Sequence, residues 1–137
     1  MAVTSEFEHG SYGDLSGVAF FGPPTRGFWF ERLAISNIYM HPLFYGVLER
    51  SWREGVAVPQ LAAEWNAGTG WRESERCEVL PDQAAEFAEA LGRLDAGDMS
   101  SECAGCTPAD CLRCALAIRA FIASVVGRGD TLYIEDE

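Results

Sequence analysis

Lysine is absent from this sequence, so its ten cationic side chains are all arginines, set against 21 aspartates and glutamates. The net charge of −11 leaves no basic footprint, which nucleic acids and anionic membranes require of the proteins that bind them. We therefore expect neither nucleic acid nor membrane as a partner. Such acidity suits a protein that docks onto a basic protein, although it also serves solubility alone.

Long apolar runs are lacking as well. No segment approaches the roughly 18–20 apolar residues that a membrane span needs. The first residues, MAVTSEFEHGSYGD, lack the basic and apolar regions of a secretory signal. The sequence thus predicts a cytoplasmic protein, in a compartment where thiols stay reduced. Cationic residues that are all arginine, with abundant alanine and glycine, indicate a GC-rich coding genome and hence a bacterial protein.

Recognisable catalytic motifs are also missing. The chain has two histidines, His9 and His41, and contains no G-x-S-x-G, P-loop or G-x-G-x-x-G sequence. His41 precedes Pro42, which places it nearer to an expected helix start than to a catalytic pair. The sequence therefore favours a protein that is not an enzyme.

The length of 137 residues predicts a single domain over residues 1–137. Short apolar runs predict strands at residues 16–22, 27–36, 74–81 and 131–135. Helical spacing of apolar residues, with proline near each start, predicts helices at residues 42–55, 59–68, 81–94 and 107–126. Because strands and helices do not alternate strictly, we expect an α+β fold in which a small mixed sheet packs with three to four helices. Residues 1–14 are expected to be mobile, and residues 95–114 to form a cysteine-rich loop and helix start.

The segment PDQAAEFAEALGRL, residues 81–94, is the clearest amphipathic helix. Its apolar stripe consists of Ala84, Phe87, Ala88, Leu91 and Leu94. Acidic residues occupy the other side of this helix and the strand before it, at positions 73, 75, 78, 82, 86 and 89. They form either a solvated face or a docking surface for a basic partner.

Four cysteines, Cys103, Cys106, Cys111 and Cys114, fall within the twelve residues CAGCTPADCLRC. Two C-x2-C pairs are a frequent way to build a tetrahedral zinc site, because sulfurs at this spacing in a tight turn reach one ion about 2.3 Å away. Residues 107–110, TPAD, resemble a capping box, which places the second pair on one face of a helix. The first pair then lies at the helix N-terminus, where partial positive charge favours thiolate. The sequence predicts a structural zinc site of all four thiolates.

Other interpretations of the cysteines remain open. Cys106, Cys111 and Cys114 also have the C-x4-C-x2-C spacing of a two-iron iron–sulfur cluster, for which Cys77 or Cys103 would be the fourth ligand. Cys111 and Cys114 continue an apolar helical stripe, so they would equally suit the core as free thiols. Disulfides are a further alternative. A structural zinc site is closed and has no open position for a substrate.

The stretch from HPLFYGVLERSWREG through GWRESERCEVLPDQAAEFAEALGRL resembles small, acidic, uncharacterised bacterial proteins, among them immunity proteins of toxin systems. The shared features are a helix, a Gly-Trp turn, an extended segment and a second helix, over about half of the chain. The cysteines are not part of the resemblance, and no functional residue is carried over. We therefore predict a non-enzymatic, immunity-like intracellular binding protein with a structural four-cysteine zinc site. The alternative is a thiol-based metal or redox sensor that uses the same cysteines.

Overall fold

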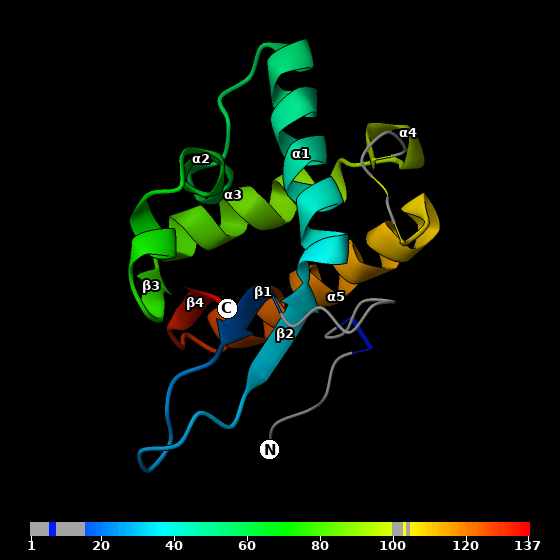
Figure 1. The fold of residues 1–137 in the computed structure, drawn as a ribbon. Coiled ribbons are helices and arrows are strands. Elements are labelled where there is room, and N and C mark those ends of the chain that lie inside the picture. The colour runs from blue at the N-terminus through cyan, green and yellow to red at the C-terminus, as the bar shows by residue number, and fades with distance from the viewer. Residues whose placement is uncertain (1–5, 8–15, 100–102, 104) are drawn as a thin grey trace.

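Four strands form one antiparallel sheet in the order β2-β1-β4-β3 (Figure 1). The strands are β1 Gly17–Phe21, β2 Arg32–Ser36, β3 Cys77–Val79 and β4 Leu132–Asp136. This computed structural model describes residues 6–7, 16–99, 103 and 105–137. The predicted α+β class is confirmed, but each described strand pair is antiparallel, so the sheet is not mixed.

Five α-helices accompany the sheet within the described residues. They are α1 Asn37–Glu54, α2 Gln60–Ala67, α3 Pro81–Gly92, α4 Ala96–Met99 and α5 Pro108–Gly127, with a 3-10 helix at Gly70–Glu73. Four of them are the expected helices, and the short α4 is additional. None of the helices in this described part is long and apolar enough to cross a membrane.

Helix α1 begins at Asn37 rather than at the predicted Pro42. Ser36 is its N-cap, and the Ser36 side chain accepts a hydrogen bond from the N–H of Ile38 at 3.2 Å. A capping serine satisfies one of the free N–H groups of a first turn, so the helix starts there. Pro42 consequently lies inside the helix. Strand β2 is shortened in turn, because Thr25 and Phe28 pair across the turn that precedes it.

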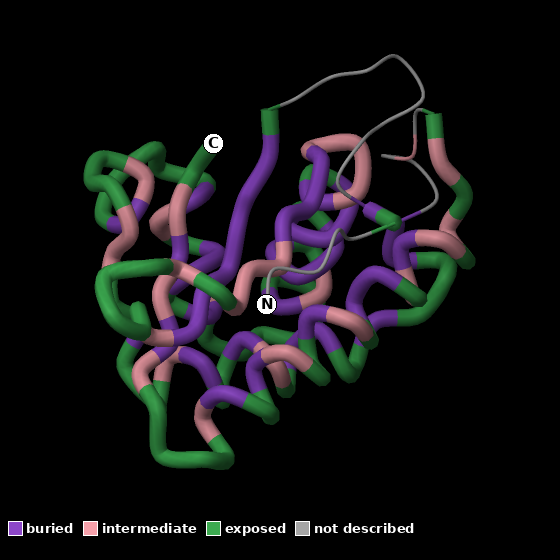
Figure 2. Tube along the Cα trace, turned by 90° about the horizontal axis from the view of Figure 1, so that it is seen from below, coloured by how far each residue is buried: buried purple, intermediate pink, exposed green. Residues whose placement is uncertain are grey.

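The main core lies between the helices and one face of the sheet. Phe44 of α1 stacks on Trp65 with ring centroids 4.7 Å apart, and its ring lies 5.5 Å from that of Phe87 in α3. Phe87 and Leu91 are fully or almost fully buried, which confirms the predicted apolar stripe of this helix. Figure 2 shows buried positions recurring along the helices between exposed ones, as amphipathic helices require.

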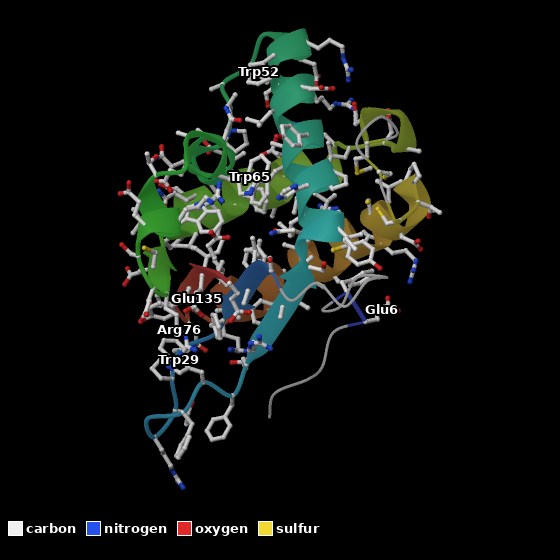
Figure 3. The ribbon with its side chains drawn as sticks, viewed as in Figure 1. Glu6, Trp29, Trp52, Trp65, Arg76 and Glu135 are labelled. Carbon is white, nitrogen blue, oxygen red and sulfur yellow. The ribbon has the colours of Figure 1, made fainter. Side chains whose placement is uncertain are left out.

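The other face of the sheet has a smaller apolar cluster of its own. Ala19, Phe21 and Ala34 are buried there against Trp29. The Arg76 guanidinium lies 4.4 Å from the Phe21 ring centroid and 4.7 Å from that of Trp29. Figure 3 shows Trp29, Arg76 and Glu135 side by side at this place, where Arg76 Nε and a Glu135 carboxylate oxygen are 3.3 Å apart.

Candidate metal centre

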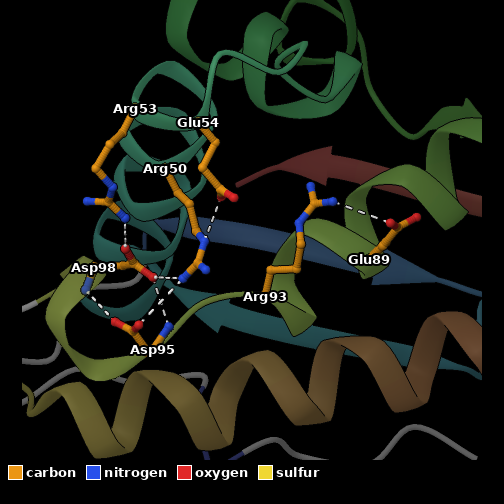
Figure 4. Close-up of polar contacts among 7 residues, drawn as sticks. All are labelled: Arg50, Arg53, Glu54, Glu89, Arg93, Asp95 and Asp98. Atoms are coloured by element: carbon orange, nitrogen blue, oxygen red, sulfur yellow. Dashed lines mark hydrogen bonds and ion pairs between the residues drawn. The ribbon is translucent and has the colours of Figure 1, made fainter.

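Asp98 of α4 fixes the start of the cysteine-bearing segment to α1. Its side chain is 3% exposed and lies 2.9 Å from Arg50 Nη1 and 2.8 Å from Arg53 Nη2 (Figure 4). The N–H of Asp95 donates to the same carboxylate at 2.8 Å. Burial by itself would raise the pKa of Asp98, but the hydrogen bonds from Asp95, Arg53 and Arg50 lower it overall. The carboxylate is therefore charged and fully partnered at neutral pH.

A capping box fixes the start of α5, as the sequence predicted. Thr107 Oγ1 accepts from the N–H of Asp110 at 3.1 Å, and Asp110 Oδ2 accepts from the N–H of Thr107 at 3.4 Å. Pro108 occupies the first turn. Gly105 has a φ of 96°, a left-handed conformation that glycine adopts without strain. The chain can thus turn sharply between the cysteines before the helix and those within it.

Three of the four predicted ligands come together in space. The sulfur of Cys111 lies 3.4 Å from that of Cys106 and 3.7 Å from that of Cys103. All three sulfurs lie within 4.8 Å of one another. A tetrahedral site with metal–sulfur bonds of about 2.3 Å has sulfur–sulfur edges of about 3.8 Å. The cysteine trio (Cys103, Cys106 and Cys111) therefore has nearly the spacing that a thiolate-bound metal requires.

The other two cysteines do not join this group. Cys114 lies one turn beyond Cys111 in α5, is fully buried, and is not among the sulfurs gathered within 4.8 Å. Cys77 belongs to β3, which lies at the opposite side of the molecule from the N-terminal end of α5 (Figure 1). The five thiols form no disulfide in the structure. An iron–sulfur cluster that uses Cys77 as its fourth ligand is not compatible with this arrangement.

Burial raises the pKa of Cys106, Cys111 and Cys114. The pKa of Cys106 rises to about 11, chiefly through burial. The pKa of Cys111 is raised by burial and by its contact with Cys106, and that of Cys114 by burial. For Cys106, loss of solvation outweighs the helix dipole, contrary to the expectation that the helix N-terminus favours thiolate. A metal must therefore displace protons when it binds.

Helix α1 supplies a backbone contact to the trio. The thiol of Cys106 donates to the Ile38 carbonyl oxygen at 3.4 Å. In a regular helix this carbonyl would accept from the N–H of residue 42, but Pro42 has none. This contact was not expected from the sequence, because the predicted helix began at Pro42 and left Ile38 outside it. A proline inside the helix is the signal that would have revealed it.

Residues near the N-terminus pack beside the centre. The ring of Phe7 lies edge-on to that of Tyr39 at 5.2 Å, and Glu6 pairs with Arg113 at 2.9 Å. Burial, with the negative charge of Asp110, raises the pKa of Tyr39. Glu6 and Phe7 thus contribute to the structure around the trio, whereas the rest of the segment 1–14 predicted to be mobile lies outside the described residues.

Comparison with family models, with curated proteins and with solved structures finds no match. The resemblance to immunity proteins stays a prediction.

Proposed function

We propose that the chain is a non-enzymatic binding protein whose cysteine trio holds a structural zinc ion. The observation that supports this is the grouping of three sulfurs within 4.8 Å, with two separations of 3.4 and 3.7 Å. Thiolates are soft ligands, and closed zinc sites in proteins are commonly built from them. The ion would tie Cys103 and Cys106, which precede α5, to Cys111 within the helix. It would thereby hold the segment between α3 and α5 in place.

Metal analysis tests this proposal directly. Protein purified without added metal should contain about one zinc ion per chain, the stoichiometry of one closed site. Cys111→Ser should lose the ion, because Cys111 contacts both other sulfurs of the trio. Cys77→Ser is the matched control, since Cys77 lies in β3 away from the trio, and it should retain the ion. A folded, metal-free protein that takes up no zinc on titration would refute the proposal.

A thiol-based sensor is the second candidate, and one observation favours it. The sulfurs of Cys106 and Cys111 are in contact at 3.4 Å, so peroxide could oxidise the two thiols to a disulfide, with the peroxide reduced to water. The thiolate is the reacting form of cysteine, and both thiols have a raised pKa. Oxidation should therefore be slow, which supports the structural role. Rapid formation of the disulfide by equimolar peroxide at pH 7 would favour the sensor instead.

The partner that we propose is a basic protein in the bacterial cytoplasm, as for an immunity-like protein. The net charge of −11 supports a basic partner through complementarity. Exposed aromatic side chains, Trp52 at 59% and Phe28 at 63%, supply anchors of the kind that interfaces favour. A partner recovered at low salt should be basic and should be released as salt screens the attraction. Recovery of an acidic partner, or binding that does not respond to salt, would contradict this part of the proposal.

A further inference from the structure

Pro42 leaves one carbonyl of α1 without its helical hydrogen bond, and this carbonyl lies against the cysteine trio. The N–H of residue 42 would ordinarily donate to the oxygen of Ile38, but proline carries no N–H. The atom that lies against this oxygen is the sulfur of Cys106, at 3.4 Å. A backbone oxygen that lacks its usual i+4 donor therefore lies against one thiol of the trio.

We propose that the Ile38 carbonyl oxygen is the fourth donor of the metal site and completes a tetrahedral set with the cysteine trio. The inference rests on the proposed zinc site and names its ligands. With zinc–sulfur bonds of about 2.3 Å and zinc–oxygen bonds of about 2.1 Å, the edges of the tetrahedron are about 3.8 Å between sulfurs and about 3.6 Å between sulfur and oxygen. The separations in the structure are 3.7 and 3.4 Å between sulfurs and 3.4 Å from Cys106 to the carbonyl oxygen. These three separations are within about 0.4 Å of the corresponding edges of the tetrahedron.

The chemistry of metal binding also favours this oxygen. The zinc ion takes the place of the Cys106 proton, so the thiolate no longer donates to the Ile38 carbonyl. A partly buried carbonyl beside a thiolate, without a donor, is destabilising. Coordination to the cation gives the oxygen a new partner. It also leaves the site with a net charge of −1 from three thiolates and Zn²⁺, whereas a fourth thiolate would make it −2 in an already acidic protein.

Cys114, the fourth ligand predicted from the sequence, is not gathered with the other three sulfurs. It is fully buried, as are Cys111 and Ile118 on the same helix. In this assignment Cys114 packs as a small apolar residue of the core.

Two substitutions distinguish the Ile38 carbonyl from Cys114 as the fourth ligand of the metal. Pro42→Ala supplies an N–H that occupies the Ile38 oxygen, so the metal-free protein should melt at a higher temperature. The same variant should bind Zn²⁺ about tenfold more weakly, because the oxygen must first give up its new hydrogen bond. Cys114→Ser should bind one Zn²⁺ with the affinity of the original protein. Zinc affinity is measured by competition with a chromophoric chelator, and Cys77→Ser is the control.

The direction in which Pro42→Ala changes zinc affinity decides whether the Ile38 carbonyl is a metal ligand. If the Ile38 carbonyl only accepts a hydrogen bond from the Cys106 thiol, the new N–H of Pro42→Ala replaces that thiol as the donor and leaves it free to bind zinc. Zinc affinity then rises or is unchanged, and this result would overturn the proposal. A loss of affinity in Cys114→Ser also overturns it in favour of four thiolates. Titration with Co²⁺ gives an independent measurement, because thiolate-to-cobalt absorption should be undiminished in Cys114→Ser if three thiolates bind. Failure of the metal site itself would appear differently, as absence of zinc binding in the original protein.

Discussion

Polar contacts of the described residues join the segment between α3 and α5 to α1 at two places, and the two attachments differ in kind. At its start, the Asp98 carboxylate is held by Arg50, Arg53 and the N–H of Asp95. At its end, the Cys106 thiol of the cysteine trio donates to the Ile38 carbonyl of α1. Ile38 and Arg50 are twelve residues apart, which is about 18 Å along a helix. The attachments therefore restrain the segment at well-separated places.

The two attachments differ in whether the protein alone supplies all of their interactions. The Asp98 attachment is complete, because its charge is neutralised and its oxygens are hydrogen-bonded by the protein itself. The trio has three sulfurs that lie close together with only weak hydrogen bonds, since thiols are poor donors and acceptors. Its spacing is close to that of a thiolate-bound metal site. One attachment is thus supplied by the fold, and the other, on our proposal, is completed by a metal.

The largest effect that we expect follows from this dependence. Zinc at a thousandfold excess over its dissociation constant should add about 4 kcal/mol to the free energy of unfolding. Asp98→Ala should retain this increment, whereas Cys111→Ser should lose it. Urea denaturation with zinc and with chelator measures both. An undiminished zinc increment in Cys111→Ser would show that the metal binds elsewhere.

The two attachments should also respond differently to pH. The pKa of Cys106 is about 11 and that of Cys111 is raised as well, so zinc must displace at least two protons at neutral pH. The apparent zinc affinity should therefore rise about a hundredfold per pH unit between pH 7 and 8. The pKa of Asp98 is lowered instead of raised. The contribution of the Asp98 attachment to stability is therefore present above the unfolded pKa of about 3.9 and is lost as the pH falls through the folded pKa. Zinc affinity that is constant from pH 7 to 8 would mean that the thiols are already ionised.

Sequence reasoning could find the local parts of this arrangement. The capping box of Thr107 and Asp110 was predictable, because both of its hydrogen bonds join residues three apart. The stripe with Phe87 and Leu91 was predictable from helical spacing. The grouping of the trio also followed from close spacing around Gly105, although the exclusion of Cys114 did not, because that depends on how α5 is rotated against the core.

The contacts between residues far apart in the chain could not be predicted from the sequence. Asp98 meets Arg50 and Arg53 across 48 and 45 residues, and no pattern in the sequence links them. The polar segment around Asp98 was predicted to be a loop, whereas it contains α4. The contact from Cys106 to Ile38 joins residues 68 positions apart and uses a backbone atom, for which residue identity gives no signal except the proline four positions later.

Substitution at Asp98 tests how much the complete attachment contributes without a metal. Asp98→Ala should lower the free energy of unfolding by about 2 kcal/mol, because it removes hydrogen bonds to a buried charge. Asp98→Asn should cost less, since the amide oxygen can still accept from one arginine. Urea denaturation in the presence of chelator isolates this contribution. A loss equal to that of Asp98→Ala in the Asn variant would mean that charge, rather than hydrogen bonding, holds the segment.

The smallest expected effect shows what burial adds to a charge pair. Glu89 of α3 and Arg93, the residue at the C-terminal cap of this helix, form an ion pair that Figure 4 shows beside the Asp98 cluster. This pair has the same kinds of charged group as the Asp98 cluster, on residues four positions apart. Their side chains are 73% and 44% exposed, against 3% for Asp98. Water solvates both partners whether or not they meet, so Glu89→Ala should change the free energy of unfolding by no more than about 0.5 kcal/mol. Urea denaturation beside the Asp98 variants makes the comparison, and an equal loss in Glu89→Ala would mean that burial is not what makes the Asp98 attachment strong.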